Sequence, residues 1–191
     1  MAKSNVRLDY DELQKLKEQI EQFGETSQVD LFLTSCAKEL AARLLAKVVK
    51  RTPTGDYSRM VKVIAKRDSK KHKKGDVYLK RVNTSGKTGG TLKRGWTSKT
   101  HEEAESGSGR GADAKEYADS LPVNKVGTDY VIEIINPVKY SSYVEFGHRT
   151  RNHKGWVEGK FMLTMSENEI RNAAPRILEK KLEKYLMECF K

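Results

Sequence analysis

The chain has few of the residues that usually build catalytic or metal-binding sites. It contains two cysteines and four histidines among 191 residues. Cys36 and Cys189 are far apart and lie among apolar residues at helical spacing, so we expect buried free thiols and no disulfide framework. His148 and His153 have two glutamates near them but no second spaced pair of ligands, so we expect no zinc site. With no nucleophile beside a base either, the sequence predicts neither an enzyme nor a cofactor.

Apolar residues are scarce as well. They make up 37% of the chain and charged residues 33%, whereas ordinary globular domains have about 45–50% and about 25%. No apolar run approaches the roughly 20 residues of a membrane-spanning helix, and the charged residues 1–11 do not resemble a signal peptide. This polar surplus indicates an exposed segment, or much surface shared with partners.

Nearly all of the net positive charge lies in one segment. The net charge is +11, and residues 62–94 hold twelve Lys and Arg against two Asp, which is +10. The protein is therefore a nearly neutral body with one basic arm. Three interpretations stay open: the arm binds nucleic-acid phosphates, contacts an acidic protein surface, or is a solvated loop. The candidate contact residues are Lys66, Arg67, Lys70, Lys71, Lys73, Lys74, Lys80 and Arg81.

A Gly-Lys-Thr sequence within residues 85–90 resembles the end of a phosphate-binding loop. That loop needs a further glycine five residues before the Gly-Lys pair, and Arg81 stands there instead. It must also open a helix, whereas a Gly-Gly-Thr sequence follows here. Nucleotide binding is therefore not expected.

Helical periodicity predicts helices over residues 9–23, 29–50 and, from residue 161 or 164, to 190, with a kink or break at Pro175. Short strands are predicted at 61–64 and 77–79, and the cation run between them should be a mobile loop or a hairpin tip. Further predictions, in chain order, are a strand at 96–100, a loop at 102–113, a helical turn at 115–120, and strands at 125–126, 129–135 and 143–146.

This order of elements predicts an α+β fold. We expect an antiparallel or mixed sheet packed against long N-terminal and C-terminal helices, with an extended basic loop or hairpin insertion at residues 56–90. The 191 residues are predicted to form a single domain.

The sequence Tyr-Ser-Ser-Tyr-Val-Glu-Phe-Gly at residues 140–147 is the most specific motif of the chain. By alternation alone it is a half-buried strand with Glu145 facing solvent. It also resembles a motif of the phage minor tail and tail-completion family. Two weaker elements precede it in the order that this family shows: a Thr-Pro-Thr-Gly turn within residues 51–55, and Gly-Gly-Thr-Leu-Lys-Arg-Gly-Trp at residues 89–96. The long insertion is similar to members from contractile-tailed phages and phage-tail-like particles.

The resemblance implies a structural part, made in the bacterial host cytoplasm and built into a virion or tail-like particle. It implies a homo-oligomeric ring, with a hexamer favoured, that caps the tail tube or joins it to the head. The implied partners are tail tube, sheath or neck proteins, with DNA possible in the lumen and no membrane. The residues expected at the subunit interface are Tyr143, Glu145, Phe146, Gly147, His148 and Arg149. The competing hypothesis is a sequence-independent nucleic-acid-binding protein that acts through residues 62–94.

Overall fold

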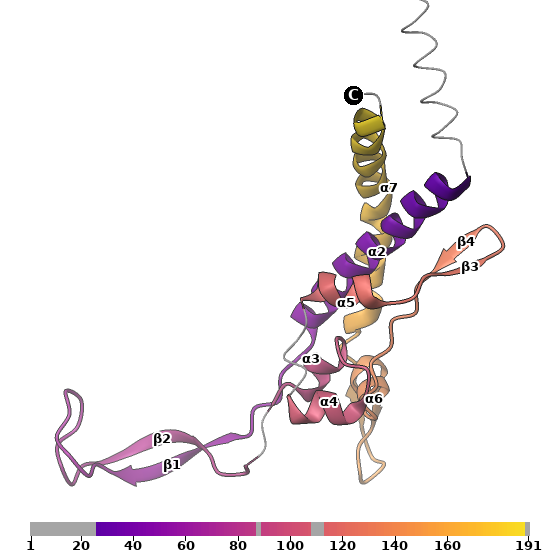
Figure 1. Ribbon diagram of the computed structural model, residues 1–191. Helices are drawn as coiled ribbons and strands as arrows, with labels where there is room; N and C mark the ends of the chain where they lie inside the picture. The colour runs from indigo at the N-terminus through magenta and orange to yellow at the C-terminus, as the bar shows by residue number, and fades with distance from the viewer. Residues whose placement is uncertain (1–25, 87–88, 108–112, 190–191) are drawn as a thin grey trace, which may run out of the picture.

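Two long helices form the spine of the protein (Figure 1). The computed structural model describes residues 26–86, 89–107 and 113–189, so the predicted helix at 9–23 lies outside the described residues. Helix α2 (Thr26–Arg51) and helix α7 (Met162–Cys189) confirm the other two predicted helices within a few residues at each end. Neither they nor any other described helix is long and apolar enough to cross a membrane.

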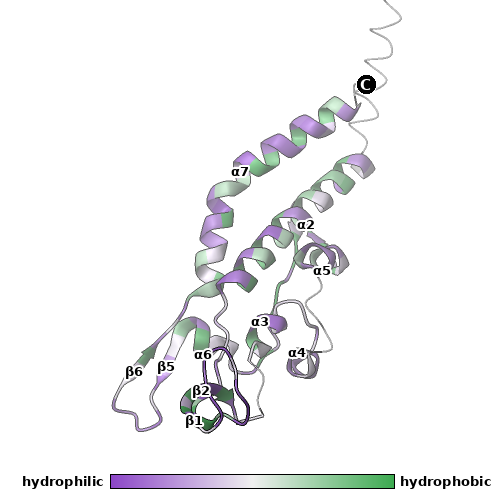
Figure 2. Ribbon diagram, turned by 90° about the vertical axis from the view of Figure 1, so that its left-hand side faces the viewer, coloured by the Kyte–Doolittle hydropathy of each residue, from purple (hydrophilic) through white to green (hydrophobic). Residues whose placement is uncertain are grey.

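Helix α7 bends along its length, and α2 and α7 pack against each other (Figure 2). Pro175 lies near the middle of α7, where its missing N–H and its ring distort a helix, so the predicted kink occurs within one continuous helix. Charged side chains join the two helices. Glu169 accepts from Lys47 at 2.8 Å and from Arg51 at 2.5 Å, and Lys181 lies 3.2 Å from Glu39.

The chain between α2 and α7 includes a β-hairpin that projects from the body of the protein (Figure 1). Strand β1 (Ser58–Ile64) pairs antiparallel with β2 (Val77–Asn83), with Ser58 opposite Asn83 and Ile64 opposite Val77. The prediction of a hairpin insertion is thus confirmed. We call residues 56–83 the basic arm from here on.

Three short helices follow the arm: α3 (Thr91–Gly95), α4 (His101–Ser106) and α5 (Ala114–Ser120). The helical turn predicted at 115–120 is confirmed by α5. The strand predicted at 96–100 is wrong, because the Thr97 and Ser98 N–H groups bond back to α3 and form turns. The loop predicted over 102–113 is wrong at residues 102–106, which belong to α4, and residues 108–112 of it lie outside the described residues. The Thr100 side chain accepts from the Glu103 N–H at 3.2 Å, and the Glu103 carboxylate accepts from the Lys99 N–H at 2.8 Å, which stabilises the start of α4.

The C-terminal half holds two more strand pairs. Strand β3 (Asn124–Val126) pairs with β4 (Asp129–Val131), and β5 (Gly147–Arg149) pairs with β6 (Trp156–Glu158), both antiparallel. Between these pairs, α6 (Ser141–Phe146) stands where a strand was predicted at 143–146, so that prediction is wrong. Strand β4 also stops at Val131, short of the predicted end at residue 135, because no described strand pairs with residues 132–135.

The core lies where α2, α3, α4, α5 and α7 converge. Its buried members include Leu45, Val48, Trp96, Val138 and Met162. Cys36 is buried and free, as predicted, and burial raises the pKa of its thiol; the side chain of Cys189 lies outside the described residues. The α+β class with long helices at both ends is confirmed, while the strands of the described residues form three two-stranded pairs in place of one sheet.

Candidate assembly surfaces

Glu145 is an internal helix cap. It is buried on α6, where its carboxylate accepts three hydrogen bonds from the start of α7. Oε2 accepts from the Leu163 N–H at 3.0 Å, and Oε1 accepts from the Thr164 N–H at 2.9 Å and the Thr164 hydroxyl at 2.8 Å. A carboxylate here satisfies free backbone donors and complements the positive end of the helix dipole. The prediction that Glu145 faces solvent is therefore wrong, because α6 turns this side chain inward.

The turn after α6 depends on two glycines. Gly147 has φ +88°, and a Cβ added there would lie 2.4 Å from the Val157 carbonyl oxygen. A Cβ on Gly159 would lie 2.2 Å from the Glu145 carbonyl oxygen. The backbone of β6 and of residues 159–161 can therefore pass directly against the end of α6. Two backbone hydrogen bonds hold these segments together. The Lys160 N–H donates to the Val144 carbonyl oxygen at 2.7 Å, and the Phe161 N–H donates to the Glu145 carbonyl oxygen at 3.0 Å.

Large apolar side chains around this turn face solvent. Tyr143 and Phe146 lie three residues apart on α6 and are 59% and 61% exposed. Trp156 on β6 is 59% exposed, and Val157 and Phe161 are also exposed. We call Tyr143, Phe146, Trp156, Val157 and Phe161 the tip patch. Five large apolar side chains exposed on this turn and on the segment that pairs with it make it a candidate for a protein–protein contact.

The other motif residues also brace the fold. The Trp96 indole N–H donates to the Thr52 hydroxyl oxygen at 2.8 Å, and the Thr52 hydroxyl donates to the Val48 oxygen at 2.6 Å, all in buried surroundings. A Cβ on Gly95 would lie 2.3 Å from Oδ1 of Asn136, so α3 packs directly against the segment that leads to α6. The three sequence elements that carry the resemblance thus hold the ends of α2, α3, α6 and α7 in place.

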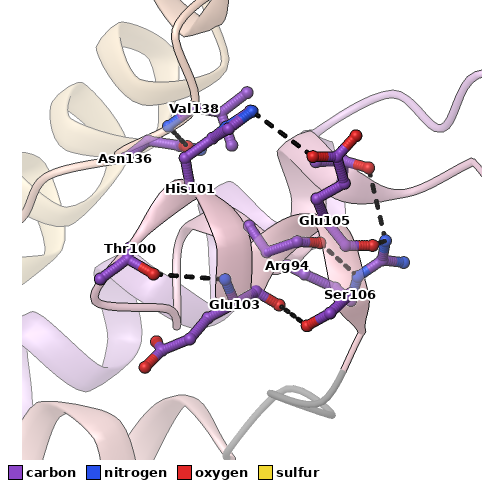
Figure 3. Close-up of polar contacts among 10 residues, drawn as sticks. Arg94, Thr100, His101, Glu103, Glu105, Ser106, Asn136 and Val138 are labelled. Carbon is purple, nitrogen blue, oxygen red and sulfur yellow. Dashed lines mark hydrogen bonds and ion pairs between the residues drawn. The ribbon is translucent and has the colours of Figure 1, made fainter.

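Arg94 forms a polar cluster with residues of α4, which begins at His101 (Figure 3). The Arg94 guanidinium donates to the carbonyl oxygens of Ala104 at 2.8 Å and Glu105 at 3.5 Å, and to that of Gly89 at 3.2 Å. It therefore stabilises the end of α4 and is committed within the body, although it falls in the basic segment 62–94. His101 Nε2 lies 3.9 Å from the Glu105 carboxylate, one turn along α4.

The turn of the basic arm is held by its two acidic residues. The Asp68 carboxylate accepts from the Lys74 N–H and the Asp76 carboxylate from the Lys73 N–H, each at 2.7 Å. His72 stacks on Tyr78, with ring centroids 4.1 Å apart. The cation run predicted as a mobile loop or hairpin tip is thus a hydrogen-bonded tip. Both carboxylates accept hydrogen bonds from backbone N–H groups. The surrounding Lys and Arg side chains are exposed and can contact a partner.

Comparison with known protein families finds one relationship. Residues 80–147 match the family model described as "Bacteriophage HK97-gp10, putative tail-component". The chain is similar to a phage tail component, as its motifs predicted. The match covers 68 of the 191 residues, from within β2 to the glycine that ends the Tyr140–Gly147 motif. No curated protein and no solved structure matches the chain.

The predicted interface stretch divides into two groups. Tyr143, Phe146, His148 and Arg149 are exposed, whereas Glu145 is buried and Gly147 lies against β6. The rings of Tyr143 and His148 meet edge to face at 5.9 Å. Their place at a subunit interface stays a prediction, as does the contact role of the arm cations. Sequence reasoning missed Trp156 and Phe161, which only the pairing of β6 with β5 brings beside α6.

Arg81 differs from the other candidate cations. It forms an ion pair with Asp56 at the base of the arm. The Ser58 hydroxyl and N–H together with this guanidinium hold the pKa of the Asp56 carboxyl below its usual value. Arg81 thus stabilises the hairpin base, which leaves seven of the eight predicted contact cations without an ion-pair partner among the described residues.

Proposed function

We propose that this protein is a structural ring component of a phage tail or tail-like particle, which caps the tail tube or joins it to the neck. Its similarity to a phage tail component supports a structural role, and no group of His, Cys, Asp and Glu among the described residues could hold a catalytic metal ion. The observation that carries the ring proposal is the tip patch, because large apolar side chains lie exposed on the turn that the motif residues brace.

In this proposal, copies associate head to tail, and rotation about one axis closes the ring, with six copies favoured. The tip patch of one copy packs on its neighbour, and His148 and Arg149 lie at the edge of that contact. Glu145 supports the interface indirectly, since it fixes α6 against the start of α7. The ring contacts tube, sheath or neck proteins through its other faces.

Sedimentation velocity over a range of concentrations tests this proposal. The unmodified protein should form a large closed species, and a Tyr143→Ser, Phe146→Ser variant should stay smaller. The matched control is Leu31→Ser, Met187→Ser, which removes two apolar side chains that are 65% and 67% exposed on the long helices. Both variants should keep the fold, since exposed positions tolerate such changes. If the Tyr143→Ser, Phe146→Ser variant assembles like the unmodified protein, the tip patch is not the ring contact.

The tip of the basic arm also supports a second candidate function, sequence-independent binding of nucleic acid. The two carboxylates near its cations accept hydrogen bonds from backbone N–H groups, so the Lys and Arg side chains can contact phosphates. In this case the isolated protein should bind DNA tightly, with an affinity that falls steeply as salt rises. Fluorescence anisotropy over a salt series, with Lys70, Lys71, Lys73 and Lys74 changed to Ala as the comparison, separates the two functions. Weak binding that the four changes do not alter would exclude this candidate.

A further inference from the structure

The basic arm makes no extensive contact with its own body. Its strands β1 and β2 pack on each other, and no other described element packs extensively on either strand. The arm extends to one side of the molecule, while β3 and β4 lie on the opposite side (Figure 1). A two-stranded hairpin alone is at best marginally stable in water, so a third strand would stabilise it.

One face of the arm alternates apolar and basic side chains. Met60, Ile64, Val77 and Leu79 are 58–64% exposed on this face. Lys62 lies directly opposite Leu79 in the same register. A phosphate backbone offers nothing to four exposed aliphatic side chains, so this face fits a protein surface that is both apolar and acidic.

Such a surface occurs on the other side of the molecule. After β4 ends at Val131, residues 132–135 continue without a strand partner among the described residues, although their sequence Ile-Glu-Ile-Ile favours a strand. Ile132 and Ile134 pack toward the core, while Glu133 and Ile135 face solvent, as Val131 does. This outer face alternates apolar and acidic side chains, in the same way as the arm alternates apolar and basic ones.

We infer that the arm of one copy adds as a strand to residues 132–135 of a second copy. The outer edge of β1 supplies hydrogen bonds to this segment, which has no strand partner among the described residues. In the joined sheet, Lys62 lies beside Glu133, and the exposed aliphatic side chains of both copies become cross-strand neighbours. Because arm and acceptor lie on opposite sides of one molecule, the contact runs head to tail and can continue around a ring.

This inference rests on the proposed function, since it requires that copies assemble, and hydrogen exchange separates the two. The unmodified protein is compared at concentrations below and above assembly. Amide protection at residues 132–135 and in β1 should rise in the assembled state. Assembly that leaves 132–135 unprotected would overturn the arm contact alone. If the chain never assembles, both proposals fail.

A charge exchange tests the pairing itself. Lys62→Glu and Glu133→Lys should each weaken assembly about fivefold to tenfold, and the combined variant should return to within about threefold of the unmodified protein. Both side chains are exposed, so each variant should fold. Lys180→Glu is the matched control, because it makes the same charge change at an exposed position of α7, outside the arm and residues 132–135, and should not alter self-assembly. Equal weakening by Lys180→Glu, or no recovery in the combined variant, would overturn the inference. Protection of the arm by added DNA, with residues 132–135 unchanged, would overturn it in favour of nucleic acid.

Discussion

The turn after α6 and the basic arm are the two regions that the sequence marks for contact with partners, and they differ in what holds them. In the turn, Glu145, Gly147 and Gly159 have their contacts inside the chain, while the tip patch, His148 and Arg149 face outward. In the arm, two short strands hold each other and touch little else. The comparison shows that motif residues such as Glu145 and Gly147 brace the fold, while the exposed apolar side chains proposed to meet a partner lie between and beyond them.

Removal of the Glu145 carboxylate should have the largest effect on stability. Glu145→Ala leaves two backbone N–H groups at the start of α7 without their acceptor. We expect a loss of about 2–4 kcal/mol in the free energy of unfolding. Urea denaturation measures it. Glu158→Ala, an exposed glutamate on the neighbouring strand, is the control and should change stability by less than about 0.5 kcal/mol. Equal effects of the two substitutions would mean that Glu145 is not a structural residue.

The buried hydrogen bond between Trp96 and Thr52 should come next. Trp96→Phe removes the indole donor, and Thr52→Val removes its acceptor. Each should cost about 1–3 kcal/mol, and the double variant should cost less than the sum, because the two residues act as a pair. Thermal or urea unfolding of the four proteins of this cycle provides the test. Strict additivity would show that the bond contributes nothing.

Deletion of the arm should leave the body nearly unchanged. Ser58 and Asn83 lie opposite each other, so an Asn-Gly turn can replace residues 59–82. The free energy of unfolding should stay within about 1 kcal/mol, because the removed strands pack mainly on each other. Assembly should be weakened in the same protein, as sedimentation would show. A loss of more than about 2 kcal/mol would contradict the contrast between an internally braced turn and an independent arm.

Acid should loosen the contact between the long helices by a small amount. Lys47, and after it Arg51, hold the pKa of Glu169 below its usual value of 4.5. The stabilisation is therefore present above that pH and is lost as the pH falls through the lowered pKa of the folded state. Denaturant midpoints from pH 6 to about pH 3 should fall less in Glu169→Gln than in the unmodified protein. Parallel curves would mean that the two ion pairs of Glu169 have no effect.

Local sequence predicted the elements whose stability is local. The apolar periodicity predicted α2 and α7, and Pro175 predicted the bend in α7. The apolar residues on both sides of the cation run predicted the two strands of the arm. The start of α4 also has a local signal that favours a helix, because Thr100 and Glu103 have the spacing of a capping box.

Elements that depend on distant contacts could not be predicted in this way. Half of the six residues of α6, namely Tyr143, Val144 and Phe146, favour strands, and α6 forms where the Glu145 carboxylate accepts hydrogen bonds from the start of α7. The strand at 129–135 was predicted beyond Val131 because its composition favours a strand, but a strand also needs a partner. The exposed position of Trp156 and Phe161 follows from the pairing of β6 with β5, which no local pattern specifies.

Electron microscopy of the purified protein tests the central claim most directly. Closed rings are expected for the unmodified protein and for the control variant Leu31→Ser, Met187→Ser, and no rings for Tyr143→Ser, Phe146→Ser at the same concentration. Rings of unchanged size in the tip variant, or single copies of the unmodified protein at every concentration, would contradict the claim.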